Sequence, residues 1–124
     1  MSDEKDLIAR IVRCGLKVNN ILGTGFDKEI YANALAVELK DSRLQAEVKK
    51  EYDIKYKGQV VGKFTPGLVV ENEVAVALVV DRDLDNILET KIRNYVRFID
   101  FKKGVILCFG DKFEFKRIEL ETSN

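Results

Sequence analysis

The first third of the chain carries apolar residues at helical spacing. Between positions 7 and 22 they recur every three or four residues, which predicts an amphipathic helix that buries one face. Gly23 and Gly25 then provide a stop signal. A second helix is predicted from Asp27, whose carboxylate is well suited to an N-cap. The residues expected on its buried side are Ile30, Tyr31, Ala34, Leu35 and Leu39.

The pattern then changes to the alternation of apolar and polar residues that is typical of strands. Positions 48–56 predict one strand, 57–58 a turn, and 59–70 a second strand. After a further turn at 71–72, the run VAVALVV at 74–80 is apolar on both faces. Such a strand is expected in the middle of a sheet that is covered on both sides.

The last third begins with acidic residues before another helical pattern. Asn86-x-x-Glu89 resembles a capping box, and Gly104 is expected to end the helix. The strands GVILCF and FEFKRI follow, separated by a turn at Gly110-Asp111. The inner residues predicted for this helix are Leu88, Ile92, Tyr95, Val96 and Ile99. The resulting order, α-α-β-β-β-α-β-β, predicts an α/β fold in which helices flank one mixed central sheet.

Size and composition indicate a single domain. The chain has 124 residues, of which 46% are hydrophobic and 34% are charged, and no linker-like stretch interrupts it. We therefore expect one domain over 1–124, with its core at about 7–120. Short flexible ends are expected at 1–4 and 121–124.

Charge and the lack of histidine narrow the chemistry. The 21 basic and 21 acidic residues cancel, so a strongly basic nucleic-acid-binding surface is not expected. Without histidine, Ser-His and Cys-His triads and His-containing zinc sites are excluded. Cys14 and Cys108 form no CxxC motif and are expected to be reduced, buried thiols. No apolar run approaches the roughly 20 residues of a membrane span, and the acidic N-terminus is unlike a signal peptide, so a cytoplasmic protein is expected.

Several short segments, taken together and in order, resemble the GxxExxY proteins, small members of the PD-(D/E)XK nuclease superfamily. The resemblance runs from about position 11 to position 118. Its segments are LGTG with the following Tyr31, ALAVEL, YKGQVVGKF, LVVENEVAVALV, NYV, GVILCFG and FKRI. It implies a nuclease-like core and, in active members, Mg²⁺-assisted hydrolysis of phosphodiesters.

The positions that carry this chemistry are changed. In the family, an Asp on one central strand and a Glu on the next hold Mg²⁺, and a Lys two residues beyond the Glu positions the attacking water. Here, the Asp position is Gly67, the Glu position is Ala77 and the Lys position is Val79. The resemblance therefore implies a scaffold without its catalytic residues.

Accessory positions have changed as well. The Glu of GxxExxY falls on Lys28, while Gly25 and Tyr31 remain. A Gln that often precedes the NY pair falls on Lys91, and a His often found before the LGxG turn falls on Asn19. The positions that shape the fold are thus retained, while the positions that carry catalysis in the family are not.

Mg²⁺ binds oxygen ligands and relies on carboxylates for charge neutralisation. Because the usual positions offer none, we expect no catalytic residue, no metal site and no cofactor. The expected role is a catalytically inactive binding module, with a protein partner or self-association first and nucleic acid second. A third possibility is that these positions were altered on purpose, by engineering or design. The same lack of activity is expected in that case.

One alternative keeps the enzyme active through relocated ligands. Asp81, Asp83 and Asp85 are the candidates for a rebuilt Mg²⁺ site in a DNA or RNA endonuclease. Three acids before a helix are also typical of capping and of favourable interaction with the helix dipole. Capping is the prediction that we favour for them.

Lys28, Tyr31 and Lys91 are the candidate binding residues. If both lysines lie in the former catalytic cleft, the cleft gains two positive charges and should attract an anion. In the alternative, each lysine faces solvent or pairs with a carboxylate such as Asp27 or Asp81. Tyr31 is also expected to pack in the core with its hydroxyl at the cleft edge. Glu29 is expected to point away from Lys28, since adjacent helical residues lie about 100° apart.

Overall fold

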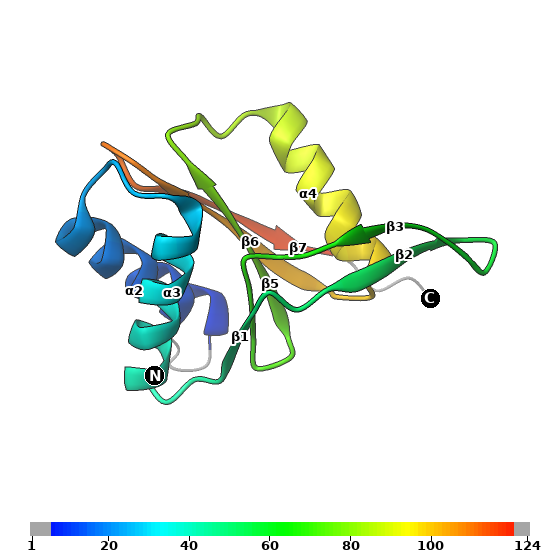
Figure 1. Cartoon of the computed structure of the whole chain (residues 1–124), viewed down its shortest axis with the longest axis horizontal. Coiled ribbons are helices and arrows are strands. Elements are labelled where there is room, and N and C mark those ends of the chain that lie inside the picture. The colour runs from blue at the N-terminus through cyan, green and yellow to red at the C-terminus, as the bar shows by residue number, and fades with distance from the viewer. Residues whose placement is uncertain (1–5, 121–124) are drawn as a thin grey trace.

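Three helices and seven strands form the part of the chain that this computed structural model describes, residues 6–120. Figure 1 shows their arrangement. The helices are α2 (Leu7–Leu22), α3 (Lys28–Asp41) and α4 (Asn86–Phe98). The strands are β1 (Ala46–Val48), β2 (Tyr52–Tyr56), β3 (Gln59–Phe64), β4 (Leu68–Val70), β5 (Val74–Val80), β6 (Lys103–Phe109) and β7 (Glu114–Glu119). The flexible ends predicted at 1–4 and 121–124 lie outside the described residues.

Five strands form a mixed sheet in the order β1-β4-β5-β6-β7. β5 and β6 run parallel, and the other neighbouring pairs are antiparallel. α4 supplies the crossover that a parallel pair requires. β5 therefore lies in the middle of the sheet, as its apolar sequence predicts.

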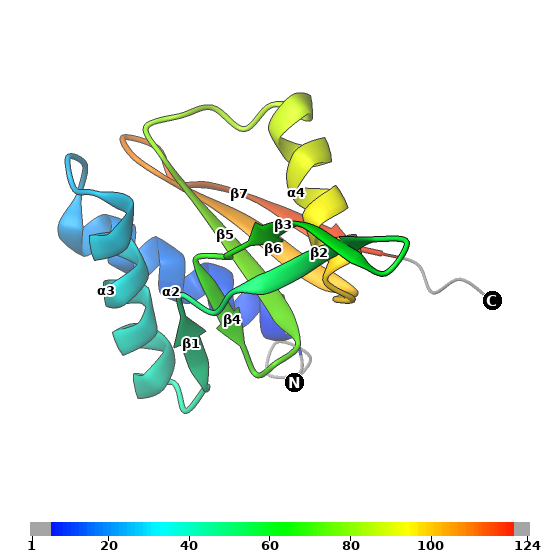
Figure 2. The same ribbon diagram turned by 45° about the vertical axis from the view of Figure 1, so that its right-hand side comes forward.

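Helices cover both faces of this sheet (Figures 1 and 2). On one side, α2 and α3 pack with Val76 and Leu78 of β5. On the other side, α4 packs with Ala75 and Ala77, because successive strand residues point to opposite faces. Burial on both faces explains why this strand has no polar residue.

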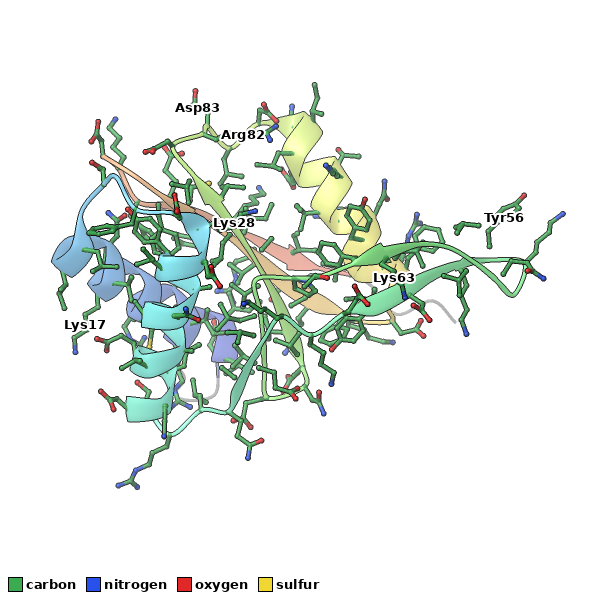
Figure 3. The ribbon with its side chains drawn as sticks, in the orientation of Figure 1. Lys17, Lys28, Tyr56, Lys63, Arg82 and Asp83 are labelled. Atoms are coloured by element: carbon green, nitrogen blue, oxygen red, sulfur yellow. The ribbon has the colours of Figure 1, made fainter. Side chains whose placement is uncertain are left out.

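β2 and β3 form a separate two-stranded sheet, called the arm below. Figures 1 and 2 show the arm extending away from the five-stranded sheet. Lys57 and Gly58 form its turn with φ values of 52° and 78°, which suits a two-residue hairpin. Tyr56 stands at the tip and is 64% exposed (Figure 3).

The arm arises from two breaks that the sequence patterns did not predict. The strand predicted over 48–56 is interrupted where Lys49 has a φ of 61°, which divides β1 from β2. The strand predicted over 59–70 is interrupted at 65–67, where Pro66 has no N–H to donate to a strand partner. Each predicted strand is therefore two, and the middle pieces leave the main sheet.

Other expectations are corrected locally. The N-cap of α4 is Asp85 and not Asn86: its carboxylate accepts the N–H of Leu88 at 2.8 Å. α4 ends at Phe98, so Gly104 does not end it and lies inside β6. A Cβ at Gly104 would come within 3.0 Å of Val96, which explains the glycine.

Three expected burials also differ. Ile30 is 43% exposed, because it lies on the side of α3 that turns away from the sheet. Val48 and Tyr56 are exposed, since they lie at the end of an edge strand and at the tip of the arm. Across residues 6–120, none of the helices has the length and apolar character needed to cross a bilayer.

Candidate functional site: the positions around Gly67 and Ala77

The strand pairing brings the two predicted carboxylate positions to one place. β4 and β5 pair antiparallel, with Leu68 opposite Val76. Extending this register by one residue sets Gly67 opposite Ala77. Gly67 and Ala77 are therefore neighbours across the central hairpin, although Gly67 itself precedes β4.

The two positions face different surroundings. Ala77 is 7% exposed and belongs to the buried cluster that α4 covers, and Val79 packs against the same cluster. A Cβ at Gly67 would lie 2.7 Å from the Cγ atom of Leu78, a residue of the opposite cluster. Packed hydrocarbon thus surrounds Ala77, the side chain of Leu78 fills the space next to Gly67 on one side, and neither position carries a charged group.

A cavity of about 390 Å³ lies beside Gly67, between the start of α3 and the hairpin. Hydrocarbon forms much of its wall, and three charged residues border it. Its lining residues are Lys28, Glu29, Ala32, Asn33, Val48, Lys49, Thr65, Pro66, Gly67 and Leu78. This cavity is the candidate binding site.

Glu29 borders the same cavity as Lys28, contrary to expectation. The lining includes two neighbouring ridges of α3, one starting at Lys28 and one at Glu29, so the cavity is wide enough to reach both. Glu29 binds the Nζ atom of Lys49 at 2.9 Å. The sequence did not single out Lys49 as a site residue, because a lysine in a stretch of alternating apolar and polar residues resembles any other solvated charge.

This ion pair fixes the charge balance of the cavity. The hydrogen bond from Lys49 lowers the pKa of Glu29, and the same bond raises the pKa of Lys49. Both groups are therefore charged at neutral pH. Among the described residues, Lys28 has no carboxylate partner, which leaves one uncompensated positive charge at the start of α3 (Figure 3).

The other two predicted binding residues do not join Lys28. Lys91 is exposed on α4, on the opposite side of the sheet, and does not border the cavity. Tyr31 is fully buried, its ring stacks on Phe109 at 4.6 Å, and its hydroxyl donates to the carbonyl of Gly23. The core role expected for Tyr31 is confirmed, and a ligand cannot reach its side chain in this structure.

The three aspartates proposed for a relocated metal site lie in two different environments. Asp85 caps α4. Asp81 and Asp83 border a separate polar cavity of about 470 Å³ near the end of β5, where Figure 3 labels Asp83. Within residues 6–120, no three side chains of His, Cys, Asp or Glu come together as a metal-binding group. Cys108 borders this cavity, but burial raises the pKa of its thiol to about 11, so the thiol is neutral.

Asn19 has a structural role. Its side chain is buried, accepts the N–H of Gly110 at 3.1 Å and donates to the carbonyl of Gly110 at 3.2 Å. It therefore ties α2 to the loop after β6. An amide on the apolar face of a helix is the sequence signal for such a bond.

Comparison with known proteins identifies the class of fold. The sequence matches the PD-(D/E)XK nuclease superfamily over residues 5–118, and the chain belongs to that superfamily. Among solved structures, it is similar to the crystal structure of SSO0001, with a TM-score of 0.57 and 16% identity over 77% of this chain. The match covers 50% of the SSO0001 chain, and at this identity it concerns the fold alone. None of the curated proteins compared with the sequence matches it. The predicted α/β nuclease-like fold is confirmed.

Proposed function

We propose that this chain is a member of the GxxExxY group that has lost catalysis and acts by binding a protein, either a partner or a second copy of itself. The observation that carries the proposal is the hydrocarbon packing at Ala77 and Val79, opposite a glycine at position 67. A divalent cation needs oxygen ligands, and these positions offer none. Apolar residues there stabilise the core, where an unpaired carboxylate would be costly.

The cavity beside Gly67 is the surface that we assign to binding. Its hydrocarbon wall suits an apolar group, and the ammonium of Lys28 suits a neighbouring anion. A protein partner with an acidic side chain next to an apolar one combines both. Nucleic acid is less favoured, because nearby cations are already paired: Lys49 binds Glu29, and Lys63 binds Asp53 at 2.8 Å and Glu51 at 3.7 Å.

Two assays test inactivity. Supercoiled plasmid and single-stranded RNA are incubated with the protein and Mg²⁺ or Mn²⁺, with and without EDTA, and calorimetry measures binding of Mn²⁺ alone. We expect no cleavage above the EDTA control and no saturable heat of binding. Nicking that EDTA abolishes would overturn the proposal and would direct attention to Asp81 and Asp83.

A matched pair of lysine variants tests the binding surface. Inorganic phosphate is titrated into isotope-labelled protein while amide chemical shifts are recorded. We expect shifts around Lys28 and Gly67 that Lys28→Glu abolishes and that Lys91→Glu, an exposed lysine on the other side of the sheet, preserves. Equal loss in both variants would indicate unspecific attraction and would contradict the assignment.

A further inference from the structure

The arm leaves the outer edge of β2 without a strand partner. Within residues 6–120, β2 pairs only with β3. An unpaired edge presents a row of backbone N–H and C=O groups to which another strand can add. A two-stranded hairpin is also only marginally stable alone, and further strands stabilise it.

The two outer edges of the arm differ in regularity. The register shift between Ile54 and Lys55 leaves Val61 as an extra residue on β3, so the bulge lies in that strand. Bulges obstruct further pairing along an edge. β2 has no extra residue, and its edge is the better template for an added strand.

A groove of about 370 Å³ follows the outer edge of β2. Tyr52, Asp53 and Lys55 line one wall, and residues 98–100 at the end of α4 line the other. Adjacent strand residues point to opposite faces, so a groove bordered by both Tyr52 and Asp53, and by no residue of β3, lies along the edge itself. The ring of Phe98 is 52% exposed on the far wall.

The sequence of β2 and its flanks is complementary to itself. The segment EYDIKYK, at 51–57, places charges of opposite sign at equal distances on either side of Ile54. In an antiparallel pairing about Ile54, Asp53 of each copy lies opposite Lys55 of the other. Tyr52 lies opposite Tyr56. Opposite charges and paired aromatic rings both stabilise cross-strand neighbours, and two-fold symmetry makes each pair occur twice.

The β7 edge of the main sheet lacks this complementarity. β7 forms one of the two edges of that sheet, the other being β1, and the sequence of β7 at 114–119 is EFKRIE. A two-fold pairing centred on Lys116 or on Arg117 sets that cation opposite its own copy. Like charges directly opposite each other are destabilising, so β7 disfavours the pairing that β2 favours.

We propose that a second copy of this chain pairs with β2 through its own β2, to form a four-stranded antiparallel sheet from two arms. This surface is separate from the cavity beside Gly67, and the proposal rests on the proposed function only for the idea that the chain associates with itself. Activity assays and the phosphate titration report on the cavity beside Gly67. Dimerisation is measured separately, so the two can fail independently.

Charge exchange at the paired positions is the principal test. Sedimentation equilibrium and light scattering are performed at low and high salt on the intact chain. We expect a monomer–dimer equilibrium that Asp53→Lys or Lys55→Asp weakens roughly tenfold or more, since each change sets like charges opposite each other twice. The double variant Asp53→Lys with Lys55→Asp should restore the dimer. A wild-type chain that is monomeric at every concentration, or a double variant no better than the single ones, overturns the proposal.

Controls separate pairing from misfolding and from other edges. Lys116→Glu on β7 changes one edge charge away from the arm and should leave the dimer unchanged; a stronger or weaker dimer would place the interface on β7. Ile54→Cys should form a disulfide-linked dimer under mild oxidation, because residue 54 meets its own copy within bridging distance. Val60→Cys, exposed on β3, should not. Preferred cross-linking at position 60 would contradict pairing through β2.

Discussion

The five-stranded sheet and the arm each contain an antiparallel hairpin with positive-φ residues in its turn, and the two hairpins reach opposite environments. The arm has a two-residue loop, Lys57-Gly58, and the sheet has a three-residue loop, 71–73, in which Glu71 and Asn72 have positive φ. In the sheet, the strand after the turn is VAVALVV and is covered on both faces. In the arm, the strand after the turn is QVVGKF, and five of its six residues are exposed. The comparison teaches that both hairpins turn through residues with positive φ, while the order of apolar and polar residues decides which hairpin becomes core and which stays exposed.

The largest expected effect comes from restoring a carboxylate in the sheet. Ala77→Glu places an unpaired charge in a hydrocarbon cluster, and we expect the free energy of unfolding to fall by about 3 kcal/mol or more. Urea unfolding measures it. The matched change in the arm, Val60→Glu, should cost less than about 0.5 kcal/mol, because Val60 is exposed. If Ala77→Glu is tolerated and the variant binds Mn²⁺, position 77 still faces an open cleft. The proposed inactivation would then come from the missing carboxylate alone and not from filling of the cleft.

The next effect concerns two glycines, one beside the sheet and one in the arm. Gly67→Ala adds a methyl group 2.7 Å from the Cγ atom of Leu78, and overpacking of this kind costs about 1–3 kcal/mol. Gly62→Ala adds the same group where no atom lies within 4 Å, and its φ is not positive, so stability should be unchanged or slightly higher. Thermal unfolding of both variants gives the comparison. Equal stability of the two would mean that Leu78 moves aside without cost, and that position 67 has room for a ligand side chain.

A smaller effect is expected at Tyr52, where the arm packs against the rest of the domain. The hydroxyl of Tyr52 is buried and has no hydrogen-bond partner among the described residues, while its ring packs against Phe101 at 5.6 Å. Tyr52→Phe removes the unsatisfied group and keeps the ring, so stability should rise by up to about 1 kcal/mol. Tyr56→Phe, at the exposed tip, should have no effect. A loss of stability in Tyr52→Phe would show that the hydroxyl has a partner in solution.

The sequence predicts the sheet better than the arm, for physical reasons. Burial on both faces leaves a continuous apolar run, so β5 and its central position can be predicted from residues 74–80 alone. The breaks at Lys49 and Pro66 are backbone events. Lys49 has a positive φ, a conformation not encoded by its residue type, and Pro66 stands inside an alternating pattern that continues through it. Alternation alone therefore extends each strand across its break.

The candidate site is only partly predictable for a related reason. The neighbours Gly67 and Ala77 follow from hairpin register, which short-range pattern determines. The separation of Lys28 from Lys91 depends on which side of the sheet each helix covers. The pairing of Glu29 with Lys49 depends on how α3 packs against β1, between residues 20 positions apart. Neither is contained in local periodicity, and both required the packed structure.

The smallest effect distinguishes the sheet from the arm by pH. Outside the arm, Arg117 on β7 donates to both carboxylate oxygens of Asp6 at 2.8 Å. These hydrogen bonds, together with the one from the N–H of Ala9, lower the pKa of Asp6 below 3.8. In the arm, the hydrogen bond from Lys63 lowers the pKa of Asp53 in the same way. A lowered carboxyl pKa contributes stability that is present above the unfolded value of 3.8 and is lost as pH falls through the lower folded value.

Removing each carboxylate charge should therefore give different acid profiles. Asp6→Asn keeps an N-cap acceptor on α2 and removes the ion pair, so the thermal midpoint should fall at neutral pH and depend less on pH between about 5 and 3. Asp53→Asn should leave the global midpoint and its acid dependence nearly unchanged, because its pair with Lys63 lies within the exposed arm. Differential scanning calorimetry over this range measures both. If Asp53→Asn flattens the acid profile as much as Asp6→Asn does, the arm unfolds together with the sheet. The two hairpins then differ in solvent exposure, but neither unfolds independently of the other.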